Sequence, residues 1–186
     1  MELYIRNMVC NRCKMLVKQE LINNGLHPLQ VELGEVEISE TLTQAQKDKL
    51  NTGLNHFGFE LIDDKKSQLI EKIKNVIVEQ VHYNDERLKT SFSKFLSRQL
   101  HHDYTYLSNL FSEVQGTTIE QYFIAQKIEK VKELLVYGEL SLSEIAVKLN
   151  YSSVSHLSRQ FKKITGLTPS HFKGLKQNKR KPLEEL

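Results

Sequence analysis

The sequence predicts an α+β fold class, with a small domain of strands and helices over residues 1–64 and an all-α domain over residues 65–176. Two observations support this prediction. Residues 1–64 alternate strand periodicity with helical periodicity, whereas the periodicity after residue 64 is helical. The charge also changes there, from 6 Lys and Arg against 10 Asp and Glu before the boundary to 20 against 13 after it.

The composition is that of a soluble globular protein, with 39% hydrophobic and 26% charged residues in a chain of 186. No apolar run is long enough to cross a bilayer, and the first ten residues lack the plan of a signal peptide. We therefore expect a cytoplasmic protein with reduced thiols and no membrane partner. The basic second part suits a polyanion, although many soluble surfaces carry a similar excess of lysine.

The first 64 residues show six elements in the order strand, helix, strand, strand, helix, strand. Alternating or helical apolar spacing places them at residues 2–9, 13–22, 29–33, 36–38, 43–56 and 59–62. Thr43 can cap the second helix, with Gln46 completing a capping box. This order is that of a ferredoxin-like βαββαβ domain, in which two helices cover one face of a four-stranded sheet.

A metal-binding motif lies where the first strand meets the first helix. Met8, Cys10 and Cys13 form MxCxxC and, with the element order, resemble the heavy-metal-associated domain of copper chaperones and metal-pumping ATPases. The resemblance covers residues 1–64 and implies that Met8 packs under the loop rather than binding metal. Asn7 stands where that family usually has glycine, so the loop geometry is expected to differ.

Two thiolates on a loop that enters a helix can both point at one ion, and the helix N-terminus lowers thiol pKa. Sulfur ligands at low coordination number favour Cu(I), with Zn(II) or Cd(II) as alternatives. Cys10 and Cys13 are therefore the predicted metal ligands. Three other interpretations stay open: a vestigial site, a redox pair, or two small buried residues.

The second part begins with a predicted helix whose apolar stripe runs from Leu69 to Val81. Residues 83–85 are expected to end this helix. Residues 90–101 predict another helix, and 101–103 a turn in which Asp103 caps the next helix. That helix presents Leu107, Leu110, Phe111 and Val114 inward. A helix, a short turn and a second capped helix form the helix-turn-helix plan.

The same plan occurs again fifty residues later. The residues Leu107, Ser108, Phe111, Gly116, Thr118 and Tyr122 recur as Leu157, Ser158, Phe161, Gly166, Thr168 and Phe172. In the second copy Asn150 can adopt a left-handed conformation, and Ser152 or Ser153 can cap the helix. Residues 119–137, stopped by Gly138, predict a stiff connecting helix. Two such units would need to lie about 34 Å apart to meet successive major-groove turns.

The pattern from Leu140 to Lys173, with LSRQFKKxTGLTPSHFK at its end, resembles the DNA-binding domain of AraC/XylS transcriptional regulators. The resemblance covers roughly residues 67 to 175. Lys127 and Val131 depart from it, because the family usually has arginine and alanine there. The resemblance implies a double helix-turn-helix domain that binds double-stranded DNA.

Exposed side chains of the two second helices are the predicted DNA contacts. Arg159 can bond guanine O6 and N7 and is the predicted base reader, whereas Lys162 and Lys163 suit phosphate. Ser155 and His156 share this face, and Ser155 by family position reads or water-bridges a base. In the first unit the corresponding residues are Thr105, Tyr106 and Asn109. That helix lacks Lys and Arg, so the first unit is alternatively only a support for the second.

The sequence thus predicts a DNA-binding transcriptional regulator that responds to a soft metal through Cys10 and Cys13, and not an enzyme, since no nucleophile elbow or phosphate loop occurs. In one alternative the chain is a chaperone-like metal-binding protein with a metal donor protein as its partner. The helical part then serves only to direct the protein to that partner or to DNA. In another the N-terminal domain only dimerises or stabilises a regulator. Residues 177–186 are expected to form a basic, disordered tail. The oligomeric state is left open.

Overall fold

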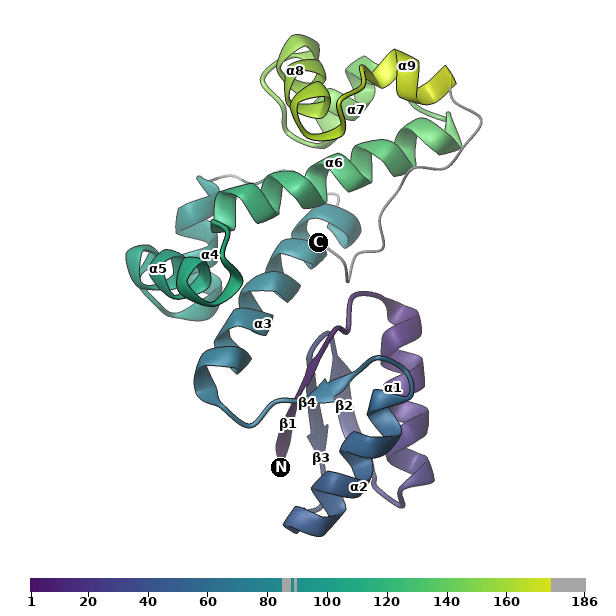
Figure 1. Ribbon diagram of the computed structural model, residues 1–186, viewed down its shortest axis with the longest axis vertical. Helices are drawn as coiled ribbons and strands as arrows, with labels where there is room; N and C mark the ends of the chain where they lie inside the picture. Colours follow the sequence, from purple (N-terminus) through teal and green to yellow (C-terminus); the bar gives the residue numbers. More distant parts are fainter. Residues whose placement is uncertain (85–87, 89, 175–186) are drawn as a thin grey trace. The chain divides into compact units, whose positions relative to one another are not determined.

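The computed structural model describes residues 1–84, 88 and 90–174 (Figure 1). The chain divides into two compact units, Met1–Asn75 and Val76–Leu186. The predicted boundary after residue 64 corresponds to the start of a helix, and the units divide eleven residues later inside it. The expected tail at 177–186 lies outside the described residues. Within the described part of the chain, no helix combines the length and the apolar character that a membrane crossing requires.

Unit 1 contains a four-stranded sheet with two helices on one face (Figure 1). Its elements are β1 (Glu2–Arg6), α1 (Asn11–Asn23), β2 (Pro28–Glu32), β3 (Glu35–Ile38), α2 (Gln44–Asn55) and β4 (Glu60–Leu61). The strand order is β2-β3-β1-β4, and each neighbouring pair is antiparallel. Leu3 and Ile5 of β1 pack in one core with Val17 and Leu21 of α1 and with residues of α2. The predicted order of the six elements is found.

The other face of the sheet carries the first part of α3 (Lys65–Val78). Tyr4 alternates with Leu3 and Ile5 and so points away from α1 and α2. The Lys72 ammonium lies 4.8 Å from the centre of its ring. Asn75 Nδ2 donates to the Leu33 carbonyl at 2.9 Å. Gly34, at φ +75°, leaves room for this amide, because a Cβ there would lie 2.0 Å from Asn75 Nδ2.

Two local predictions in unit 1 were wrong. The strand expected over residues 2–9 ends at Arg6, because Asn7 turns the chain with φ 70°. The helix expected from residue 13 begins at Asn11. Leu16 and Ile22, two of the apolar residues whose helical spacing predicted this helix, are 43% and 50% exposed, because α1 buries only the narrower stripe of Val17 and Leu21.

Unit 2 is helical among its described residues. After the end of α3 and a π-helical turn η1 (Glu79–Tyr83), it contains α4 (Phe92–Leu100), α5 (Tyr104–Gln115), α6 (Ile119–Tyr137), α7 (Leu142–Lys148), α8 (Val154–Thr165) and α9 (Pro169–Gly174). The connecting helix α6 has the predicted bounds and contacts η1, α5, α7, α8 and α9 (Figure 1). Of the predicted break at 83–85, Tyr83 still belongs to η1, Asn84 follows the end of that turn, and Asp85 lies outside the described residues.

A side-chain cap begins the second helix of each repeat. Asp103 accepts hydrogen bonds from the backbone N–H groups of Thr105 and Tyr106, as predicted. Of the two candidate serines in the second repeat, Ser153 is the cap and accepts from the His156 N–H at 3.1 Å. The preceding turns each contain a non-glycine residue in the left-handed conformation, His101 at φ 54° and Asn150 at φ 57°.

The repeated residues have the same structural roles in both copies. Gly116 and Gly166 end α5 and α8 in the left-handed conformation. Phe111 packs against Tyr122 with ring centres 5.6 Å apart, and Phe161 packs against Phe172 at 5.5 Å. The repeat therefore encodes a helix, its stop, and the aromatic contact that holds it. Val114, predicted to face inward, is 45% exposed, as is its counterpart Ile164.

Candidate nucleic-acid interface

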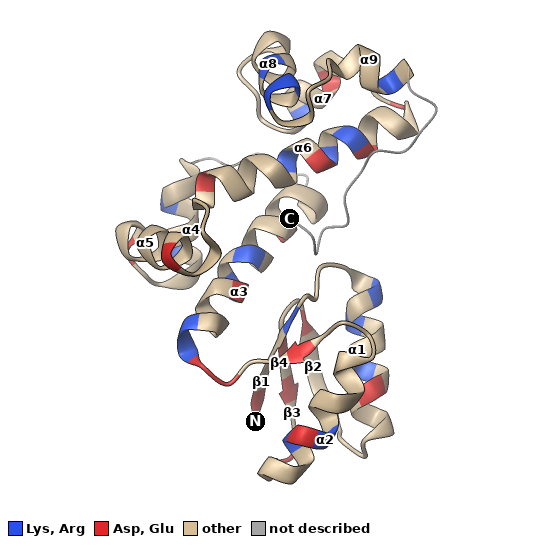
Figure 2. Ribbon diagram, viewed as in Figure 1, with Lys and Arg blue, Asp and Glu red and all other residues tan. Residues whose placement is uncertain are grey.

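Helix α8 separates an apolar face from a basic one. Leu157 and Phe161 are fully buried against the core formed with α6, α7 and α9. Arg159, Lys162 and Lys163 are exposed. Figure 2 shows basic residues along α8 in blue. None of the three forms an ion pair with a carboxylate of the described residues. Their charges are therefore available to an external polyanion.

The N-terminal turn of α8 holds two further predicted residues. Ser155 and His156 are both exposed. His156 Nδ1 lies 3.0 Å from the Ser152 hydroxyl, and its ring meets the Tyr151 ring edge-on at 5.3 Å. These contacts fix the imidazole at the start of the helix. Ser155 lies beside His156, and both residues precede Arg159 by about one helical turn.

Helix α5 presents a polar face without cations. Thr105, Tyr106 and Asn109 are exposed, whereas Leu107 and Phe111 are buried on the opposite side. The Tyr106 ring packs beside that of His102 at 5.5 Å. The helix contains no Lys or Arg and carries Glu113 (Figure 2). It can offer hydrogen bonds to base edges but little neutralisation of phosphate.

The two faces belong to helices that pack at different parts of α6. With 19 residues, α6 is about 28 Å long at 1.5 Å per residue. Its buried side includes the polar residues Gln126, Glu129 and Lys132, which the sequence analysis missed. Glu129 pairs with Lys132, and Gln126 bonds His82 of η1 at 3.0 Å and the Tyr122 hydroxyl at 3.1 Å. These pairings satisfy the buried groups and favour one packing of η1 on α6.

The predicted metal ligands lie close together at the start of α1. Cys10 is the N-cap residue and Cys13 is in the first turn, with the two sulfur atoms 3.3 Å apart. Both are half-buried free thiols. Burial raises the pKa of the Cys13 thiol, partly offset by hydrogen bonds from the backbone of Val9 and Cys10. Among the residues that the structure describes, no cluster of three or more potential ligands occurs.

Comparison with known proteins agrees with the geometry of unit 2. Residues 96–174 match the family of the helix-turn-helix domain. Over these residues the chain is similar to a helix-turn-helix domain. The C-terminal domain of AraT, a response regulator from Geobacillus stearothermophilus, shares this fold with a TM-score of 0.50 and 24% identity. The match covers 60% of this chain and 88% of that one.

Two relatives of the helix-turn-helix domain are much longer proteins. YtdP of Bacillus subtilis, an uncharacterized HTH-type transcriptional regulator, is 26% identical over 162 residues, covering 82% of this chain and 21% of YtdP. An uncharacterized HTH-type transcriptional regulator of Staphylococcus aureus is 27% identical over 114 residues, covering 61% of this chain and 14% of its own length. The chain thus spans about a fifth of the first relative and about a seventh of the second.

The helix-turn-helix domain brings the predicted DNA contacts together in two groups. Five lie on α8, and Thr105, Tyr106 and Asn109 lie on α5. Cys10 and Cys13 precede the matched residues and belong to unit 1. The structure also draws attention to Lys127 of α6, whose ammonium lies over the ring of Tyr151, just before α8. The sequence indicated Lys127 only as a position where the resembling family usually has arginine.

Proposed function

We propose that this chain binds double-stranded DNA sequence-specifically, as part of a transcriptional regulator of the AraC type. The observation that carries this proposal is the exposed face of α8, where Arg159, Lys162 and Lys163 have no carboxylate partner among the described residues. A capped helix with such a face, preceded by a short turn and a buried helix, suits the major groove.

The residues divide into base readers and phosphate contacts. Arg159, one turn into α8, reads guanine through two hydrogen bonds, and Ser155 and His156 contact the bases or their waters nearer the helix start. Lys162 and Lys163 contact phosphate. On α5, Asn109 pairs with adenine, Thr105 meets a thymine methyl group, and Tyr106 lies beside them. The two helices read separate half-motifs, since about 28 Å of α6 connects their units.

The first experiment is selection of binding sites from random DNA, followed by titration of the selected site and of an unrelated duplex. Arg159→Ala should weaken binding to the selected site about 10- to 100-fold and binding to the unrelated duplex less than about 3-fold. Lys18→Ala, an exposed change on α1, is the matched control and should alter neither. Equal losses on both duplexes would show that Arg159 contacts only phosphate.

A second function is favoured by the sulfur pair of unit 1. We propose that unit 1 is a ferredoxin-like domain of the heavy-metal-associated type, in which Cys10 and Cys13 bind a soft metal ion. Two sulfur atoms 3.3 Å apart are close enough to converge on one ion, after a small side-chain rotation that widens their separation to what ligands at about 2.3 Å require. Cu(I), which accepts few ligands, suits this pair better than Zn(II), which requires four. The bound ion would change how the helix-turn-helix domain engages DNA.

The metal proposal and its alternatives are separated by one set of measurements. Protein purified with reduced thiols is assayed for bound copper and zinc, and its DNA affinity is titrated at two salt concentrations. A metal-responsive regulator takes up about one Cu(I) per chain and changes its affinity for the selected site. A chaperone-like protein binds Cu(I) but binds all DNA at the nonspecific level, and a regulator with idle cysteines binds DNA alone.

Cys10→Ser/Cys13→Ser should abolish uptake, whereas Met15→Leu, at a neighbouring exposed sulfur, should not. The contradicting result is that Cu(I) leaves the affinity of the wild type for the selected site unchanged and that the double variant binds this site equally well with and without Cu(I). That result would remove metal response from the proposed function. DNA binding itself would still stand, because its test does not involve the cysteines.

A further inference from the structure

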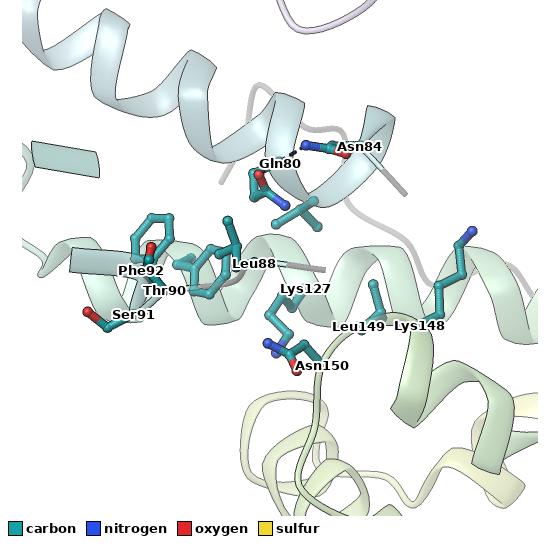
Figure 3. Close-up of a pocket in the computed structure, with 12 residues that line it drawn as sticks. Gln80, Asn84, Leu88, Thr90, Ser91, Phe92, Lys127, Lys148, Leu149 and Asn150 are labelled. Carbon is teal, nitrogen blue, oxygen red and sulfur yellow. Dashed lines mark hydrogen bonds between the residues drawn. The ribbon is translucent and has the colours of Figure 1, made fainter. Parts of the chain in front are cut away.

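Unit 2 contains a cavity of about 210 Å³ that the proposed DNA contacts do not use. Its wall is formed by η1, the residues leading into α4, the middle of α6 and the turn between α7 and α8 (Figure 3). Residues widely separated in the sequence thus meet around one space. A molecule in it would touch both α6 and the turn that precedes α8.

One wall of the cavity carries a cation that has no carboxylate partner among the residues that the structure describes. The Lys127 side chain runs from α6 toward Asn150 (Figure 3). Its ammonium lies 3.8 Å from the centre of the Tyr151 ring. No carboxylate of the described residues is within ion-pair distance of Lys127. Burial lowers the pKa of Lys127 to about 8, so the group is still mainly protonated at pH 7. A partly desolvated ammonium is stabilised by an anion.

The rest of the wall combines polar side chains, such as Gln80 and Ser91, with an apolar part. The Phe92 and Phe123 rings stack with centres 4.0 Å apart and planes 6° from parallel, and Leu149 adds to the lining. An apolar cavity of about 150 Å³ in another protein holds benzene. The volume here is larger, so a six-membered ring and one carboxylate can fit together.

We propose that this cavity binds a small organic carboxylate with a compact apolar ring. The carboxylate pairs with the Lys127 ammonium, and the ring packs against Phe92, Phe123 and Leu149. The size of the cavity excludes long acyl chains, and the cation selects against neutral and cationic compounds of the same shape. Occupancy holds the turn at Asn150 against α6. This site goes beyond the proposed function and does not depend on it.

The probe is cyclohexanecarboxylate, and its uncharged isostere cyclohexanecarboxamide is the reference. The full chain is titrated with each at pH 7 by calorimetry. The carboxylate should bind with a Kd of about 1 mM or tighter, at least about tenfold tighter than the carboxamide. Lys127→Met should remove this preference, and Lys127→Arg, which restores the cation, should keep it. Lys173→Met is the matched control, because Lys173 is an exposed lysine of α9 that does not line the cavity.

A second variant tests the location. Thr90 is an exposed residue of the cavity wall, so Thr90→Trp should fill the space without disturbing the fold and abolish binding of both compounds. Circular dichroism confirms that each variant is folded. The absence of saturable carboxylate binding, equal affinity for the two compounds, or unchanged affinity in the folded Lys127→Met and Thr90→Trp variants would each overturn the proposal.

Discussion

Asn7, which precedes the CxxC loop where the resembling family usually has glycine, adopts a backbone conformation that glycine favours. Its φ of 70° is in the left-handed region, which asparagine tolerates better than most residues. Its Nδ2 also donates to the Gly58 carbonyl at 2.9 Å. We expect Asn7→Val to lower the free energy of unfolding by about 2 kcal/mol, because a β-branched residue is strained there and the hydrogen bond is lost.

Urea denaturation of the full chain, followed by far-UV circular dichroism, measures this change. Asn7→Gly is the matched control and should cost about 1 kcal/mol or less, since glycine adopts the conformation freely and loses only the amide contact. A Val variant as stable as the Gly variant would mean that the backbone at residue 7 relaxes to a negative φ.

Lys127 should make stability depend on pH in a window above neutrality. Its pKa is about 8 in the folded chain and about 10.5 when exposed in the unfolded chain. Between these values the unfolded state binds more protons, so the free energy of unfolding rises with pH. From pH 8 to 9.5 the gain should be about 2 kcal/mol at most. Above pH 10 buried tyrosines reverse it, because burial raises the pKa of Tyr151.

Urea denaturation at pH 8.0, 8.8 and 9.5 tests this dependence. Lys127→Met removes the titrating group, so the free energy of unfolding of this variant should not show the rise with pH. Subtracting the variant's free energy of unfolding from that of the wild type cancels the contributions of the thiols and other groups that titrate in this range. Parallel pH profiles of the two proteins would show that water reaches the Lys127 ammonium in the folded chain.

At the scale of elements, α5 and α8 share a buried frame and differ in their exposed charge. Lys162→Ala or Lys163→Ala should weaken binding to all duplexes and reduce the slope of log K against log salt by about 0.9. Asn109→Ala on α5 should weaken binding only to the selected site, with no change in slope. Filter binding at four salt concentrations measures both effects. If Asn109→Ala affects neither duplex, α5 only supports α8.

Element boundaries were predictable where the chemistry is local. Helix caps and turns are specified by residues at most a few positions apart, and the structure contains the ones that were predicted. They are the capping box of Thr43 with Gln46, the cap Asp103, and the turn at Asn150 followed by the cap Ser153. The fixed spacing of the repeat likewise predicted the two helix-turn-helix units. The exposed faces of α5 and α8 followed from helical periodicity, because the buried leucines and phenylalanines fix which side remains outside.

Features that depend on distant contacts were not predictable. The π-helical turn η1 at Glu79–Tyr83 and the short helix α9 at Pro169–Gly174 have no distinctive periodicity. Gln126 is an unremarkable polar residue in sequence, and its burial follows from His82 lying against it. The environment of Lys127 similarly requires residues near 90 and 150 to meet on α6. Periodicity reports which face is buried but not which polar group it meets.

At the scale of the whole molecule, the two motifs share one chain, and thermodynamics constrains any coupling between them. If Cu(I) at Cys10 and Cys13 changes the affinity for the selected DNA by some factor, bound DNA must change the Cu(I) affinity by the same factor. Couplings of this kind are commonly about 5- to 150-fold. We expect a change of at least about fivefold, appearing equally in both measurements.

DNA titrations with and without one equivalent of Cu(I) give the first factor, and competition with a Cu(I) chelator in the presence and absence of the selected duplex gives the second. Cys10→Ser/Cys13→Ser should reduce both factors to one. Unequal factors in the wild type would mean that the ion acting on DNA binding is held elsewhere than at the sulfur pair. Equal factors that persist in the double variant would exclude Cys10 and Cys13 as the ligands of the ion that acts on DNA binding. Factors of one in the wild type would mean that unit 1 has no metal-dependent effect on DNA binding.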